Sequence, residues 1–131
     1  SLPEHCSHPA VYLPGTLVVQ GASYSTAPQL AVELARYEGV AAWPVILLVD
    51  STAEATCSLQ EFLWTLFTRF EPAADIHCRE QTVHRFHVGL EPPVVFDCRM
   101  KPWYTEVLEV DPVTKRQVDE RIAELLPSRY R

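Results

Sequence analysis

The sequence predicts an α/β domain, a mostly parallel β-sheet with helices packed on it in the order β-α-β-α-β-(β)-β-α. The uninterrupted apolar run at residues 45–49 (VILLV) is typical of a strand buried on both faces, as the central strands of parallel sheets are. It stops at Asp50, and a helical pattern follows. A second apolar run, residues 94–96, stops at Asp97 in the same way. Loops at the carboxyl ends of such strands usually carry the sites of these folds.

The helix predicted for residues 58–71 has a clear start and a clear end. Ser58 and Glu61 have the spacing of a capping box, and Pro72 cannot continue the helix. The apolar residues that recur with helical spacing, and are expected to pack on the sheet, are Leu59, Phe62, Leu63, Leu66, Phe67 and Phe70. Thr65 and Arg69 are expected on the opposite side.

The remaining elements are predicted more loosely. Residues 1–14 are expected to form an irregular N-terminal arm, and residues 15–131 a single α/β domain. The other expected elements are a strand at 16–20, a helix starting at Ser25 or Thr26 and stopping at Gly39, an edge strand at 75–79, an extended segment at 81–88 and a final helix capped by Asp111. The apolar face of the final helix comprises Val118, Ile122, Leu125 and Leu126.

Composition limits the possible functions. The net charge of −6 over 131 residues argues against nucleic acid or an anionic membrane as partner. No apolar run approaches the roughly 20 residues that a membrane-spanning helix needs, and no signal peptide is recognisable, so a cytoplasmic location is expected. The four scattered cysteines (6, 57, 78 and 98) are expected to be free thiols.

Few motifs point to chemistry. Gly-rich phosphate loops and a nucleophile elbow are both missing from the sequence. The only dense cluster of metal-capable side chains is His5, Cys6 and His8, which lacks further ligands at the spacing of a zinc site, so a surface arm is favoured. His84 and His87 lie three apart in an expected strand and should point to opposite faces.

Two pairs of charged residues and a set of aromatic residues each allow two interpretations. Asp50 and Asp97 are either site carboxylates or, as we favour, residues that order the following loops. Arg99 and Lys101 could bind an anion, but we expect a solvated pair of charges. Trp64 and Trp103 (with Tyr104) are either interface anchors or packing residues. These residues by themselves predict a fold without a complete active site: no catalytic, cofactor-binding or metal residue is assigned.

Residues 45–76 carry a more specific pattern. A strand ends in an acidic loop, a helix follows with W-x-x-x-T-R at residues 64–69, and a proline then precedes an acidic-hydrophobic strand start. This pattern resembles the C-terminal domain of the UbiD family of reversible decarboxylases. Residues 95–98 with 101–103 (VFDC, KPW) resemble the family's later I-D-A-T-x-K stretch, and the resemblance covers residues 15–126.

The resemblance implies a function that this chain does not perform alone. UbiD enzymes use a prenylated flavin mononucleotide and a divalent metal to add or remove CO2 on aromatic and α,β-unsaturated acids. The flavin-binding region and its Glu-Arg-Glu set belong to preceding domains. The resemblance therefore implies a chain that is inactive alone, supports oligomer assembly and closes the active-site cleft of a flavin-bearing large subunit or missing N-terminal domains.

The sequence also departs from the family. The loop at residues 50–56 is longer and less charged, and Arg99 stands where the family has threonine, so direct contact with cofactor or substrate is not expected. The residues expected to line an interface or cleft are Asp50, Trp64, Arg69, Asp97, Lys101 and Trp103. The alternative function is a non-catalytic, self-associating assembly module without a decarboxylase partner.

Overall fold

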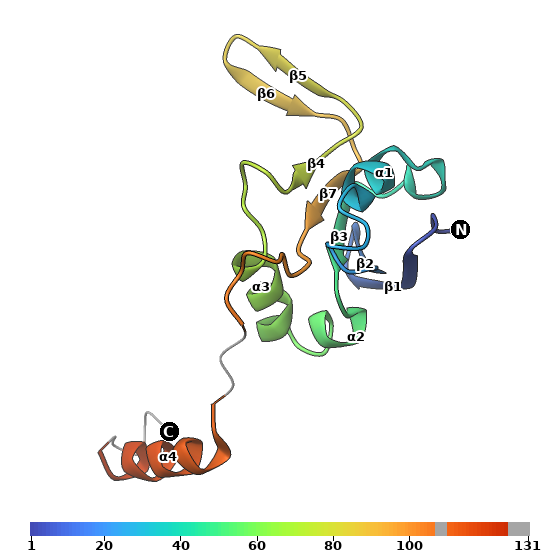
Figure 1. Ribbon diagram of the computed structural model, residues 1–131. Coiled ribbons are helices and arrows are strands. Elements are labelled where there is room, and N and C mark those ends of the chain that lie inside the picture. The colour runs from blue at the N-terminus through green and yellow to red at the C-terminus, as the bar shows by residue number, and fades with distance from the viewer. Residues whose placement is uncertain (107–109, 126–131) are drawn as a thin grey trace.

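The computed structural model describes residues 1–106 and 110–125 of the chain and centres on a five-stranded sheet (Figure 1). The strands lie in the order β1 (Cys6–Leu13), β2 (Thr16–Gly21), β3 (Val45–Val49), β7 (Val94–Asp97) and β4 (Ile76–His77). The three central strands are parallel, whereas β1 and β4 pair antiparallel at the two edges. The predicted α/β class is confirmed, but the predicted order of elements is not.

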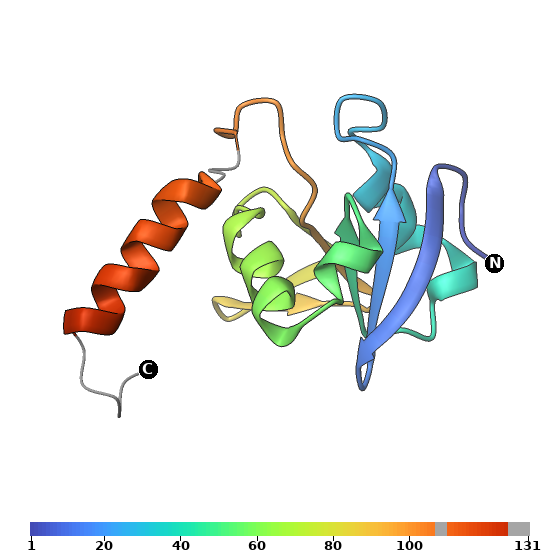
Figure 2. The same cartoon turned by 90° about the horizontal axis from the view of Figure 1, so that it is seen from below.

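Helices cover both faces of the sheet (Figure 2). Helix α1 (Leu30–Arg36) packs on one face, and α2 (Thr52–Ala55) and α3 (Leu59–Thr68) pack on the other. Alternate residues of β3 enter the two layers: Ile46 and Leu48 face α1, while Leu47 and Val49 face α3. This two-sided burial is the reason why the β3 sequence is apolar at every position.

The N-terminal segment was predicted to be irregular, and this prediction is wrong for residues 6–13. They form β1, whose pairing with β2 shifts register between Ser7 and Ala10. His8 has a positive φ of 46° within this irregularity, and Pro9 follows it. The bulge breaks the alternation of buried and exposed residues, so the sequence shows no strand period here.

Residues 81–90 form a β-hairpin rather than one extended segment. Its strands are β5 (Gln81–His84) and β6 (His87–Leu90), and it projects away from the sheet (Figure 1). The turn residues Arg85 and Phe86 both have positive φ, as the two central residues of a type I′ hairpin turn do. Because His84 pairs directly with His87, both side chains lie on the same face, so the prediction of opposite faces is wrong.

The other helices differ from prediction mainly at their ends. Helix α1 begins at Leu30, later than the predicted caps, and Gly39 lies in a short 3-10 helix, η1 (Glu38–Val40). Helix α4 (Pro112–Leu125) is capped as predicted, since Asp111 Oδ2 accepts from Thr114 N at 2.9 Å. None of its described residues is buried, and Figure 1 shows it apart from the sheet. Leu126 lies outside the described residues.

Two predictions from composition can also be checked. The four cysteines are free thiols, as predicted. Within the described ranges, no helix is both long and apolar enough to cross a membrane.

Candidate functional site

Helix α3 is held to the sheet by one part of its predicted apolar face. The helix starts as predicted, because Ser58 Oγ accepts from Glu61 N at 3.1 Å. Phe62 is buried in the core, with Leu66 and Phe70 packed beside it. Thr65, predicted to face solvent, is also buried.

The rest of the apolar face of α3 is exposed. Leu59, Leu63 and Phe67 are 56%, 41% and 69% exposed, so the prediction that they pack on the sheet is wrong. Trp64 beside them is 57% exposed. The apolar residues of α3 cover a wider part of the helix surface than packs on the sheet. Their helical spacing alone does not show which of them face the sheet. We call Leu59, Leu63, Trp64 and Phe67 the outer strip of α3.

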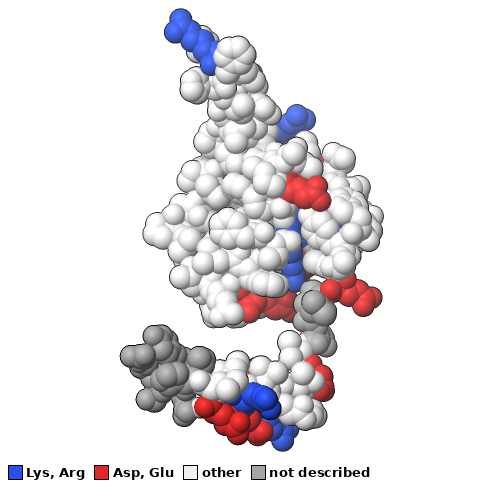
Figure 3. Space-filling view, turned by 90° about the vertical axis from the view of Figure 1, so that its left-hand side faces the viewer, with Lys and Arg blue, Asp and Glu red and all other residues white. Residues whose placement is uncertain are grey.

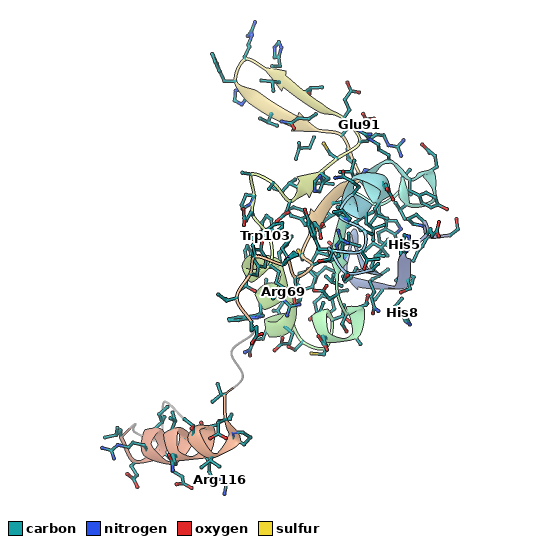
Figure 4. All side chains as sticks on the ribbon, in the orientation of Figure 1. His5, His8, Arg69, Glu91, Trp103 and Arg116 are labelled. Atoms are coloured by element: carbon teal, nitrogen blue, oxygen red, sulfur yellow. The ribbon has the colours of Figure 1, made fainter. Side chains whose placement is uncertain are left out.

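A pocket of about 440 Å³ adjoins the outer strip. It is lined by Trp64 and Thr68 of α3, by Arg69 directly after the helix, and by Met100 and residues 103–106 of the loop after β7. Trp103 is exposed, and its ring packs edge-on against Tyr24 and Tyr104. Figure 4 shows Arg69 and Trp103 at this junction of α3 and the loop. The body of the molecule presents a broad uncharged area on this side (Figure 3).

Asp50 contacts two of the residues that line the pocket, Arg69 and Met100. Its Oδ2 accepts a hydrogen bond from Met100 N at 2.8 Å and lies 3.4 Å from Arg69 Nη1. Asp50 therefore joins the end of β3 to α3 and to the loop after β7. This arrangement favours the interpretation that Asp50 orders a loop.

At the end of β7, Asp97 and Arg99 form a fully buried ion pair. Arg99 Nε and Nη2 donate to the two carboxylate oxygens of Asp97 at 2.9 and 2.7 Å, with side-chain exposures of 0% and 1%. Arg99 Nη1 donates to the carbonyls of Ala22 and Ala27. Arg99 thus fastens the β2–α1 loop to the end of β7 and is not available for an external anion.

Lys101 is buried and paired in the same way. Its Nζ lies 2.9 Å from Asp75 Oδ2 and donates to the carbonyls of Arg69 at 2.8 Å and Asp97 at 2.5 Å. These three partners match the three protons of the ammonium group. The expectation that Arg99 and Lys101 are solvated is wrong, because both are buried and internally paired.

The structure thus brings all six predicted residues to one edge of the sheet. Three of them (Trp64, Arg69 and Trp103) line the pocket, and Asp50, Asp97 and Lys101 support it. A contact of these residues with a partner stays a prediction. Sequence reasoning predicted Trp64 but missed the other residues of the outer strip, Leu59, Leu63 and Phe67. It also missed Asp75 as the partner of Lys101, although the resemblance includes an acidic residue at that position.

The N-terminal histidines lie elsewhere. His5 directly precedes β1 and His8 lies in it, and Figure 4 shows both apart from Arg69 and Trp103. In residues 1–106 and 110–125, no group of three or more His, Cys, Asp and Glu side chains is arranged to hold a metal ion.

The fold and this edge define a class of protein. It is an α/β domain with helices on both faces of the sheet, and the exposed apolar side chains of α3 mark a candidate interaction surface at this edge.

Comparison with known proteins shows which proteins this chain is similar to. A Chlamydia muridarum protein without an assigned function is 32% identical over 130 residues, covering 92% of this chain and 22% of the relative. A Chlamydia pneumoniae protein named as a subunit of 4-hydroxybenzoate decarboxylase is 36% identical over 96 residues, covering 73% of this chain and 16% of the relative. No protein-family model matches the chain.

A solved structure has the same fold. Vanillic acid decarboxylase of Sedimentibacter hydroxybenzoicus, in an open form, aligns with a TM-score of 0.51 at 18% identity, over 85% of this chain and 27% of that chain. The resemblance indicated by the W-x-x-x-T-R helix is confirmed, because the chain is similar in sequence to a relative named as a decarboxylase subunit and in fold to a decarboxylase. It spans about a fifth of the length of the curated relatives it matches.

Proposed function

We propose that this chain is the part of a reversible decarboxylase that docks on the flavin-bearing part and closes its active-site cleft. The substrates would be aromatic or α,β-unsaturated acids, and the chain would act in the cytoplasm within an oligomer. The similarity to a relative named as a decarboxylase subunit supports this proposal.

The observation that carries the proposal is the continuity of the outer strip of α3 with the pocket. Trp64 belongs to both, so the two form one surface. Trp, Tyr, Met and Arg are the residue types enriched in protein interfaces, and buried aromatic and Arg anchors supply most of their binding energy. This surface contains Trp64, Arg69, Met100 and Trp103.

The described residues of the pocket do not fit the cofactors of the family. Arg69 is its one lining cation and is already close to Asp50, so it does not form a phosphate site for a flavin mononucleotide. Glu106 is its one lining carboxylate, which is too few oxygen ligands for a divalent metal. In this proposal the partner therefore binds the prenylated flavin and the metal. Lys101 and Arg99 hold the loop after β7 in place through their buried contacts.

The proposal is tested by titrating the chain into a UbiD-type large subunit from the same genome, loaded with prenylated flavin. We expect Trp64→Ala and Trp103→Ala each to weaken binding by about thirtyfold, because truncating an interface hot spot costs about 2 kcal/mol or more. Phe86→Ala is the matched control, since Phe86 is a fully exposed aromatic residue at the hairpin tip. It should bind as tightly as the wild type.

Two results would overturn the proposal. Stoichiometric binding of prenylated flavin by the isolated chain, or decarboxylation without a partner, would place the chemistry on this chain. A homodimer that the two Trp substitutions dissociate, with no binding to the large subunit, would favour the assembly module instead.

A further inference from the structure

The β5–β6 hairpin exposes an apolar face to solvent. Directly paired residues of two antiparallel strands share a face, and so do alternate residues along each strand. The register therefore puts Val83, Val88 and Leu90 on one face of the hairpin. All three are exposed, as is every residue from 80 to 92. We call Val83, Val88 and Leu90 the hairpin face.

The opposite face of the hairpin is polar. It carries Thr82, His84 and His87, together with Gly89. An apolar face and a polar face are typical of a sheet that packs on a core on one side and contacts water on the other. An isolated two-stranded hairpin is at best marginally stable in water. The hairpin therefore has the pattern of a structure whose apolar face is covered by another protein surface.

The turn of the hairpin supports a role in recognition. Its central residues, Arg85 and Phe86, have φ of 49° and 67°, where Asn-Gly is the usual sequence. Positive φ is uncommon for such bulky residues, and residues held in these conformations cluster at functional sites. The turn thus presents a cation and a fully exposed aromatic ring at the tip of the hairpin.

The charges of the hairpin indicate what covers its apolar face. Arg85 lies at the tip, whereas Glu80 and Glu91 lie opposite each other at the base, where Figure 4 labels Glu91. Within residues 1–106 and 110–125, no ion pair involves any of these three groups. Two antiparallel hairpins would bring Arg85 of each copy to the two carboxylates of the other, whereas a parallel pair would put like charges together.

We propose that the hairpin face binds the hairpin face of a second copy of this chain, in an antiparallel two-fold arrangement. A two-fold axis forms an interface from one self-complementary patch used twice. The hairpin supplies both the apolar side chains and the opposite charges that such a patch needs.

The shape of the molecule is compatible with this arrangement. The hairpin projects from the sheet (Figure 1), so the two domains would lie at opposite ends of the hairpin pair. A strand of four residues is about 13 Å long, which exceeds the screening length of about 8 Å at physiological ionic strength. The net charge of −6 on each chain therefore opposes the pairing only weakly.

This proposal rests on the proposed function only for the oligomer, to which it gives a surface. No residue of the hairpin lines the pocket beside α3 or belongs to the outer strip. Pairing of two copies through the hairpins therefore leaves Trp64 and Trp103 free to dock on the large subunit.

Sedimentation equilibrium of the intact chain tests the proposal. We expect a monomer–dimer equilibrium with a Kd on the order of 10 μM, because so small a surface lies at the weak end of protein interfaces. Val88→Glu should raise this Kd at least about tenfold, because it would bury a carboxylate without a partner. Thr82→Glu is the matched control, since it adds the same charge to the opposite face of the hairpin and should leave the Kd unchanged.

Charge reversal tests the antiparallel orientation. Arg85→Glu should raise the Kd about fivefold, because it replaces an attraction across the interface by a repulsion. Adding Glu80→Arg and Glu91→Arg to this variant reverses all three charges and should restore the Kd of the wild type.

Three results would overturn the proposal. The first is a chain that stays monomeric at about 300 μM. The second is an equal change of the Kd by Val88→Glu and Thr82→Glu, with both variants folded by circular dichroism. The third is a dimer that Trp64→Ala dissociates and Val88→Glu does not. Docking on the large subunit is titrated separately, and Val88→Glu should dock as the wild type does, so that either proposal can fail alone.

Discussion

Neutralising Asp97 alone should destabilise the domain strongly, because it leaves the guanidinium of Arg99 buried without its counter-ion. Asp97→Asn keeps the shape of the side chain and removes the charge. Arg99 is fully buried and makes both hydrogen bonds of a bidentate pair with Asp97. Arg99→Met is the reciprocal change, and it also removes the donor to the carbonyls of Ala22 and Ala27.

The expected size of the effect follows from burial. Breaking a buried ion pair by removing one partner costs about 3–5 kcal/mol, whereas domains of this kind are stable by about 5–15 kcal/mol. The double variant Asp97→Asn/Arg99→Met has no uncompensated charge. We therefore expect it to be more stable than the sum of the two single losses predicts, by about 1–3 kcal/mol.

Urea unfolding followed by far-UV circular dichroism measures all four free energies of unfolding in one cycle. Lys115→Ala is the control, because its ion pair with Asp119 is also short, at 2.5 Å, but is exposed to solvent. It should cause no measurable change. A loss of less than about 1 kcal/mol for Asp97→Asn, the range of exposed pairs, would refute the argument that burial makes this pair different.

Further predictions concern the core, the helix cap, the thiols and pH. Leu47→Ala should lower the free energy of unfolding by about 2–5 kcal/mol, and Ser58→Ala should lower it by about 1 kcal/mol. Urea unfolding measures both values. A smaller loss for Leu47→Ala than for Ser58→Ala would contradict the burial of β3 on both faces. Iodoacetamide should label Cys57, which is exposed, in the native protein, but Cys98 only after unfolding, because burial raises the pKa of that thiol to about 12; mass spectrometry of the labelled peptides checks this, and native labelling of Cys98 would contradict it. Burial lowers the pKa of His77, so the unfolded chain binds a proton on this imidazole more readily than the folded chain does. The neutral imidazole therefore contributes its full stability above pH about 6.5, and this contribution decreases as the pH falls toward the pKa of the folded state. His77→Gln should flatten this part of the stability–pH curve, and an unchanged slope would contradict the assignment.

Local features of the chain were predictable because their signals lie within a few residues of one another. The run at 45–49 indicated a strand buried on both faces, and the spacing of Ser58 and Glu61 indicated the start of α3. The hairpin was not predictable in this way, because its turn carries Arg85 and Phe86 where Asn-Gly would be the usual signal.

By itself, the sequence determined the α/β class, the buried central strand, the start of α3 and, through the W-x-x-x-T-R helix, the resemblance to UbiD-type decarboxylases. Only the tertiary structure decided which charges are buried and which apolar residues stay outside. Arg99 is buried because its partners include the carbonyl of Ala22, 77 residues away in the chain. Phe67 is exposed because the sheet covers only one flank of α3. Such contacts join distant segments, and no local period encodes them.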